Sequence, residues 1–110
     1  MINNTRDKTI SIIKLTMESN DLFHQILYYV KNDNFLKAQQ YLNRGNELLL
    51  EAVSIHTLLL LEVKEVDLLL IHAEDLLISV QLYESMIKEI IDVYKKFPTL
   101  KGNQQTLINQ

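Results

Sequence analysis

The chain has 110 residues, a formal net charge of −3 and no cysteine, and 47% of its residues are apolar. This length and apolar content indicate a single folded domain rather than a disordered segment. The two glycines and one proline exclude turn-rich all-β and collagen-like chains, and the lack of cysteine excludes disulfide scaffolds, thiolate metal sites and cysteine nucleophiles. Because the 11 basic residues are spread along the chain, no polyanion-binding surface is indicated.

Residues 1–8 are polar and lack the apolar core of a signal peptide, which predicts a cytoplasmic location. The most apolar stretch, residues 48–63, contains Glu51, His56 and Glu62. It falls short of the roughly 18 uncharged residues that a membrane span needs. We therefore expect no insertion into a membrane.

Apolar residues recur at steps of three and four along almost the whole chain, which predicts helices. The helices are expected over residues 8–31, 34–62 and 66–97, within a domain of residues 1–97 that precedes a polar tail of residues 98–110. Alternating steps of three and four are typical of helices that pack at shallow angles in a bundle.

The first break between helices has clear signals, and the second does not. Residues 32–34 read Asn-Asp-Asn, turn formers of which Asp33 or Asn34 can cap the next helix. Residues 62–67 contain neither glycine nor proline, and the apolar stripe passes through them in phase. One helix over residues 34–97, about 95 Å long, is therefore the alternative to a turn near residues 62–67. Because only the turn lets the chain close a compact core, we expect an all-α, antiparallel three-helix bundle.

The third expected helix has a wider apolar arc than a three-helix bundle can cover. Its polar side, which includes Glu74 and Glu84, takes up less than half of the helix. Outside the core stripe lies a second apolar row, made of Leu68, Ile71, Ile78, Leu82 and Met86. Asp75 lies inside this row, where a carboxylate is costly to bury unless it is paired or binds a cation. The row indicates self-association through this helix.

Three histidines are candidates for chemistry. The simplest interpretation of His24 is a surface residue, and that of His56 is a hydrogen-bonded residue on the core stripe. His72 follows the apolar run of residues 68–71 and precedes Ala-Glu-Asp. Taken alone, His72 also fits a structural histidine, so the choice between a structural and a functional role depends on the residues around it in the sequence.

Three segments match the motifs of one protein family in order and spacing. Residues 66–76 read VDLLLIHAEDL, where the family has an apolar run followed by His-Ala-Gln-Asp-His-Leu. Residues 34–38 read NFLKA, against Gly-Asn/Asp-Phe-x-x-Ala, and residues 51–59 read EAVSIHTLL, against Ala-His-x-x-Gln-Thr-x-Leu. On these motifs, residues 10–97 resemble a divergent member of the lactose/cellobiose-type IIA components of the bacterial sugar phosphotransferase system.

The resemblance implies an antiparallel three-helix bundle that assembles as a homotrimer and serves as a phosphotransferase component. His72 corresponds to the histidine that accepts a phosphoryl group from the histidine phosphocarrier protein and passes it to a IIB cysteine. Asp75 corresponds to the aspartate that binds a divalent metal at the trimer axis, where Mg²⁺ suits oxygen ligands. The sugars implied are β-glucosides or galactosides such as cellobiose, chitobiose or lactose.

The chain departs from the family motifs at four positions. Leu76 and Glu74 replace the second histidine and the glutamine of the active motif. Val53 and His56 replace the histidine and the glutamine of the second segment. Each change alters a polar group expected near the phosphoryl group, and Glu74 adds negative charge there if its side chain points that way.

The main alternative is a helical oligomeric interaction protein that has the same scaffold without phosphotransfer, and in which His72 is structural. A histidine phosphotransfer domain is disfavoured because no Lys and Gly follow His72 closely. A carboxylate-bridged di-metal bundle needs Glu-x-x-His, which none of the three histidines completes. Nucleic-acid binding is disfavoured because the sequence has no basic stripe.

Overall fold

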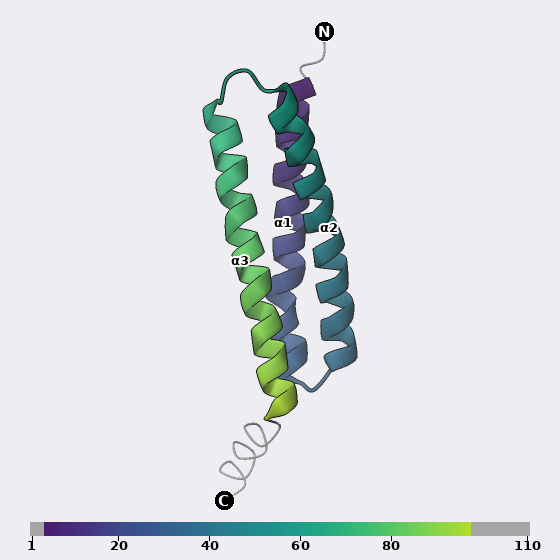
Figure 1. Cartoon of the computed structure of the whole chain (residues 1–110). Coiled ribbons are helices and arrows are strands. Elements are labelled where there is room, and N and C mark those ends of the chain that lie inside the picture. Colours follow the sequence, from purple (N-terminus) through teal and green to yellow (C-terminus); the bar gives the residue numbers. More distant parts are fainter. Residues whose placement is uncertain (1–3, 98–110) are drawn as a thin grey trace, which may run out of the picture.

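The computed structural model describes residues 4–97, which form three long helices packed side by side (Figure 1). The helices are α1 (Asn4–Lys31), α2 (Phe35–Glu62) and α3 (Leu68–Lys96). α1 and α3 run in one direction and α2 in the other. Within residues 4–97 there is no strand, so the predicted all-α, antiparallel three-helix bundle is confirmed. The expected tail over residues 98–110 lies outside the described residues.

The first connection follows the polar triplet of the sequence. Asn34 caps α2, because its side-chain oxygen accepts a hydrogen bond from the backbone N–H of Lys37 at 3.1 Å. Asp33 has a φ of 60°, in the left-handed region that aspartate tolerates better than most residues. α2 therefore begins at Phe35, one residue after its cap, rather than at residue 34.

The second connection, residues 63–67, turns the chain where the apolar stripe permitted a continuous helix. Val63 leaves the helical region for an extended backbone, with ψ 128°. Asp67 is also extended and caps α3, since its side chain accepts a hydrogen bond from the backbone N–H of Leu70 at 2.8 Å. The single-helix alternative over residues 34–97 is thereby excluded.

The core lies along the line where the three helices meet. The largest fully buried side chains that are apolar are Phe23, Ile12, Ile26, Leu59, Leu70, Ile87 and Val30. α1 and α2 approach closely at Gly45, whose carbonyl oxygen accepts a hydrogen bond from Ser19 Oγ at 2.7 Å. A Cβ at position 45 would lie 2.9 Å from Cδ1 of the Phe23 ring and still nearer to Cε1. Glycine at this position therefore lets the ring fill the space between the two helices.

The interface between α2 and α3, which we call the α2–α3 seam, is the least extensive of the three helix interfaces. It contains two polar links. Asn46 Nδ2 donates a hydrogen bond to Glu84 Oε2 at 2.9 Å, and His56 Nε2 lies 3.2 Å from Glu74 Oε2. Glu84 is buried, although the sequence period places it on the polar side of the helix. The charge is tolerated because Asn46 and Lys88 both hydrogen-bond to its carboxylate.

None of the described helices is both long enough and apolar enough to cross a membrane.

Candidate functional site

His72 lies one turn after the start of α3, on an exposed part of the helix. Together with Leu68 and Leu69 it lines an open hollow whose other walls are apolar. Within residues 4–97 its imidazole makes no hydrogen bond, and the residue is exposed, so an incoming molecule can reach the ring. A neutral imidazole with an accessible nitrogen is a nucleophile at neutral pH.

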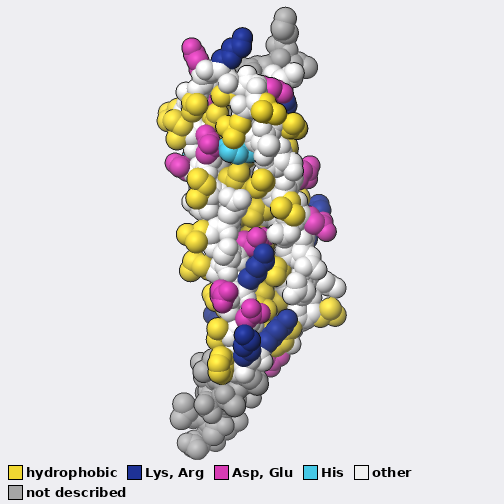
Figure 2. Space-filling view, viewed as in Figure 1, with side chains coloured by type: hydrophobic (Ala, Val, Ile, Leu, Met, Phe, Trp, Pro, Cys, Tyr) yellow, Lys and Arg dark blue, Asp and Glu magenta, His cyan; other side chains and the backbone are white. Residues whose placement is uncertain are grey.

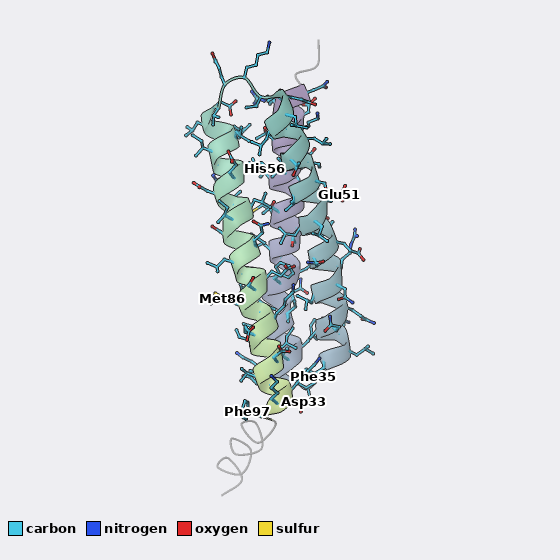
Figure 3. All side chains as sticks on the ribbon, viewed as in Figure 1. Asp33, Phe35, Glu51, His56, Met86 and Phe97 are labelled. Carbon is cyan, nitrogen blue, oxygen red and sulfur yellow. The ribbon has the colours of Figure 1, made fainter. Side chains whose placement is uncertain are left out.

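The other two histidines are engaged by neighbouring helices. His24 on α1 lies beside Tyr83 of α3, with Nδ1 3.2 Å from the hydroxyl and the ring centroids 5.0 Å apart. Burial raises the pKa of Tyr83, so its hydroxyl stays protonated and can donate to His24 Nδ1. His56 is half-buried and faces Glu74 near the end of the bundle where α2 leads into α3 (Figure 3). His72 is thus the histidine whose ring is available for chemistry.

Glu74 does not bring its charge to the His72 side of the helix. Residues two apart on an α-helix point about 200° apart around its axis. The Glu74 carboxylate reaches across the seam to His56 of α2. His72 lies three turns before Tyr83 on the same side of α3, and Tyr83 contacts α1. The two side chains therefore occupy opposite edges of α3.

Val53 and Leu76 stand where the family motifs have histidines, and both contribute apolar packing. Val53 is half-buried against the hydrophobic core, and Leu76 is half-buried on α3. Neither side chain can bind a phosphoryl group by hydrogen bonding. Of the four positions that differ from the motifs, two are therefore apolar, and the other two, His56 and Glu74, contact each other.

The second apolar row of α3 is exposed along its whole length, as its position outside the core stripe predicts for a single chain. The exposed fractions are 81% for Leu68, 47% for Ile71, 64% for Ile78, 62% for Leu82 and 55% for Met86. Apolar side chains recur down the outer edge of α3 in the space-filling view (Figure 2). Asp75 lies in this row and is also exposed. Within residues 4–97, no three His, Cys, Asp or Glu side chains converge in a way that could hold a metal ion. One chain thus offers one carboxylate from this row.

Sequence reasoning missed the two polar links of the α2–α3 seam. Both depend on the antiparallel register of α2 and α3, which joins Asn46 to Glu84 and His56 to Glu74. The two pairs are ten residues apart on each helix, as an antiparallel register requires, but the sequence carries no signal that specifies this register. The aromatic contact between His24 and Tyr83 was likewise not anticipated.

The family comparison covers nearly the whole bundle. The model of the family described as "PTS system, Lactose/Cellobiose specific IIA subunit" matches residues 7–95, from the first turn of α1 to the last turn of α3. Comparisons with curated proteins and with solved structures found no match. The matched region includes the exposed histidine of α3 and both helices that flank it. The chain therefore belongs to the lactose/cellobiose-specific IIA family of the sugar phosphotransferase system.

Proposed function

We propose that the protein is a phosphoryl carrier that works on the cytoplasmic side of a sugar phosphotransferase system. His72 accepts a phosphoryl group from the histidine phosphocarrier protein and passes it to a cysteine of a IIB component. The main support is an exposed imidazole without a hydrogen-bonding partner in the described chain, at the start of α3 in a region that matches the IIA family. Neither of the other histidines combines these properties.

The chemistry is two displacements at phosphorus. In the first, the lone pair of a His72 ring nitrogen attacks the phosphorus of the donor phosphohistidine. The N–P bond of the donor breaks, and its electron pair returns to the donor imidazole. In the second, the IIB thiolate attacks the phosphorus on His72, and the electron pair of that N–P bond returns to the His72 ring. The proteins mainly have to supply positioning and charge stabilisation.

The surroundings of His72 suit this exchange. Leu68 and Leu69 flank the ring with apolar surface, which a docked partner can cover so that water is excluded from the phosphoramidate. The carboxylate of Glu74 lies on the opposite edge of α3, so its repulsion of a phosphoryl group is reduced by distance. Val53 and Leu76 cannot hydrogen-bond to the phosphoryl oxygens, so these two positions contribute no such stabilisation.

The experiment that tests this function is reconstitution of the phosphoryl relay, in which each protein passes the phosphoryl group to the next. The protein is incubated with phosphoenolpyruvate, enzyme I and the phosphocarrier protein, and bound phosphate is measured. We expect a phosphoryl group that is labile in acid and stable in base, as a phosphohistidine is, and none when the phosphocarrier is omitted. A protein that stays unlabelled while the phosphocarrier is phosphorylated would instead support the helical interaction protein.

We further propose that three copies associate through the exposed apolar row of α3, with Asp75 of each chain around one Mg²⁺. A row this apolar is unusual on a monomer. Burying it brings the carboxylates together, and without a cation or a proton their desolvation and repulsion oppose assembly. Carboxylate oxygens are ligands that Mg²⁺ prefers, so the exposed carboxylate of Asp75 is a suitable ligand for this ion. One Mg²⁺ there would offset two of the three negative charges and so would reduce the repulsion that opposes assembly.

Replacing Asp75 by leucine should preserve the trimer and stabilise it by about 1–4 kcal/mol, because the variant removes both repulsion and desolvation. Light scattering and thermal unfolding, each with and without a chelator, measure the effect. The chelator should destabilise the unmodified protein and leave the variant unaffected. As a matched control, Ile78→Asp adds an uncompensated carboxylate to the same row and should dissociate the trimer. An unmodified protein that is monomeric at micromolar concentration would contradict both the trimer and the metal site.

The sugars that we propose are β-glucosides or galactosides such as cellobiose, chitobiose or lactose. In such a system the membrane IIC component binds the sugar, so no residue of this chain selects it. A strain that lacks the protein should grow normally on glucose and poorly on at least one of these disaccharides. Growth defects confined to an unrelated class of sugar would contradict this assignment.

A further inference from the structure

The start of α3, where His72 lies, has few polar anchors. The preceding connection, residues 63–67, contains no regular helix, and α3 packs less on α2 than on α1. Leu70 and Ala73 are buried, and they hold the first two turns of α3 against the core. In the described part of the chain, the hydrogen bond between Glu74 and His56 is the only side-chain hydrogen bond that joins residues 68–76 to another helix.

This bond is a directional restraint on the rotation of the first turns of α3 about the helix axis. Leu70 and Ala73 pack against the core, but apolar packing is not directional and leaves small rotations possible. A hydrogen bond at the edge of the helix is directional and resists rotation. His72 and Glu74 lie within one helical turn, so any rotation that moves one moves the other. Since the side chains extend about 5 Å from the helix axis, a rotation of about 10° moves the imidazole by about 1 Å.

We propose that His56 is a positioning residue for the phosphoryl transfer at His72. Its imidazole holds the carboxylate of Glu74 on the α2 edge of α3, and this hydrogen bond sets the orientation of the turn that presents His72. The inference rests on the proposed function of His72. It also explains why the two polar departures from the family motifs occur together, because each supplies the partner that the other needs.

The test compares three variants in the reconstituted relay. His56→Leu removes the hydrogen bond, His56→Gln restores a donor of similar reach, and Asn46→Leu breaks the other link of the same seam. Asn46 is a matched control because its partner Glu84 lies twelve residues from His72, about 18 Å along α3. Thermal unfolding of all three variants is measured in parallel, so that a loss of stability can be separated from a loss of positioning.

His56→Leu should lower kcat/KM for phosphoryl transfer from the phosphocarrier about tenfold, since misplacing a reacting group by about 1 Å is costly. His56→Gln should restore kcat/KM to near the unmodified level. Asn46→Leu should be destabilised and yet keep kcat/KM. Equal rates in His56→Leu and the unmodified protein, or equal losses in His56→Leu and Asn46→Leu, would overturn the positioning role.

A second readout separates this inference from the proposed function. The ring resonances of His72 and the amide exchange of residues 68–76 are measured by NMR in the same variants, without any partner protein. They should change in His56→Leu, return in His56→Gln and stay unchanged in Asn46→Leu. If the unmodified protein accepts no phosphate but this pattern appears, the proposed function fails while the anchoring of the His72 turn by His56 stands. If phosphate is accepted but the pattern is absent, His56 has no positioning role.

Discussion

Replacing His72 by glutamine should abolish phosphoryl acceptance and leave the fold unchanged. An amide has no nucleophilic nitrogen, so no phosphoramidate can form at position 72. The imidazole is exposed and has no partner within residues 4–97, and substitutions at such sites change stability by only about 0.5 kcal/mol or less. Labelling through the reconstituted relay, together with circular dichroism and thermal unfolding, measures both effects.

The two other histidines provide matched controls for this experiment. His24→Gln and His56→Gln should both remain labelled, because neither ring is the proposed acceptor. His24 contacts Tyr83, so some loss of stability is expected in His24→Gln and not in His72→Gln, whereas glutamine at position 56 keeps a donor for Glu74. Phosphate that remains bound to His72→Gln would place the acceptor elsewhere in the chain.

The largest loss of stability is expected for Phe23→Ala. The Phe23 ring is completely buried, fills the space left by Gly45, and packs edge-on against Tyr83 with centroids 6.3 Å apart. Truncating such a ring typically costs about 3–5 kcal/mol. Because small domains are stable by only about 5–15 kcal/mol, this substitution should bring the bundle close to unfolding. Urea denaturation followed by circular dichroism measures the change.

A double substitution tests whether Phe23 and Gly45 act together. Gly45→Ala gains about 1 kcal/mol of helix propensity but places a Cβ against the ring, where overpacking costs about 1–3 kcal/mol. We expect a net destabilisation in the presence of Phe23. In the Phe23→Leu background two of the three ring atoms nearest to position 45, Cε1 and Cζ, are gone, so Gly45→Ala should cost less or become neutral. Equal effects of Gly45→Ala in both backgrounds would show that the ring does not require the glycine.

Local signals in the sequence were sufficient for most of the fold. The apolar period identified the three helices, and the Asn-Asp-Asn triplet located the first turn, with Asn34 as the cap. α1 begins at Asn4, ahead of residue 8, because polar residues without an apolar period still extend an exposed helix. α3 begins at Leu68 rather than residue 66, because Asp67 provides its cap.

The second turn and the links of the α2–α3 seam depend on interactions between segments that are distant in sequence. Residues 62–67 have no glycine or proline, so only the need to close a core predicted a turn there. The period alone placed Glu84 on the solvent side, whereas Asn46 and Lys88 satisfy its carboxylate in a buried position. A helical-wheel projection of one helix cannot show a hydrogen-bonding side chain that belongs to a second helix.

For the candidate site, too, local features could be predicted from the sequence and contacts between helices could not. The motif around His72 selected one histidine of three, and that ring is exposed and has no partner in the described residues. The sequence alone does not predict where the Glu74 carboxylate points, because this depends on which helix lies beside that edge of α3. The contact with His56 places the carboxylate on the α2 side.

The most direct measurement of the central claim is the position of the phosphoryl group. The protein, labelled with ¹⁵N on its histidine rings, is phosphorylated through the relay at neutral pH, and the ring nitrogens of His24, His56 and His72 are followed by NMR. We predict that one ring nitrogen of His72 acquires the large shift and the coupling to ³¹P that mark an N–P bond, while the rings of His24 and His56 acquire neither. A ³¹P coupling on His24 or His56, or on no histidine while the phosphocarrier itself is phosphorylated, would contradict the account.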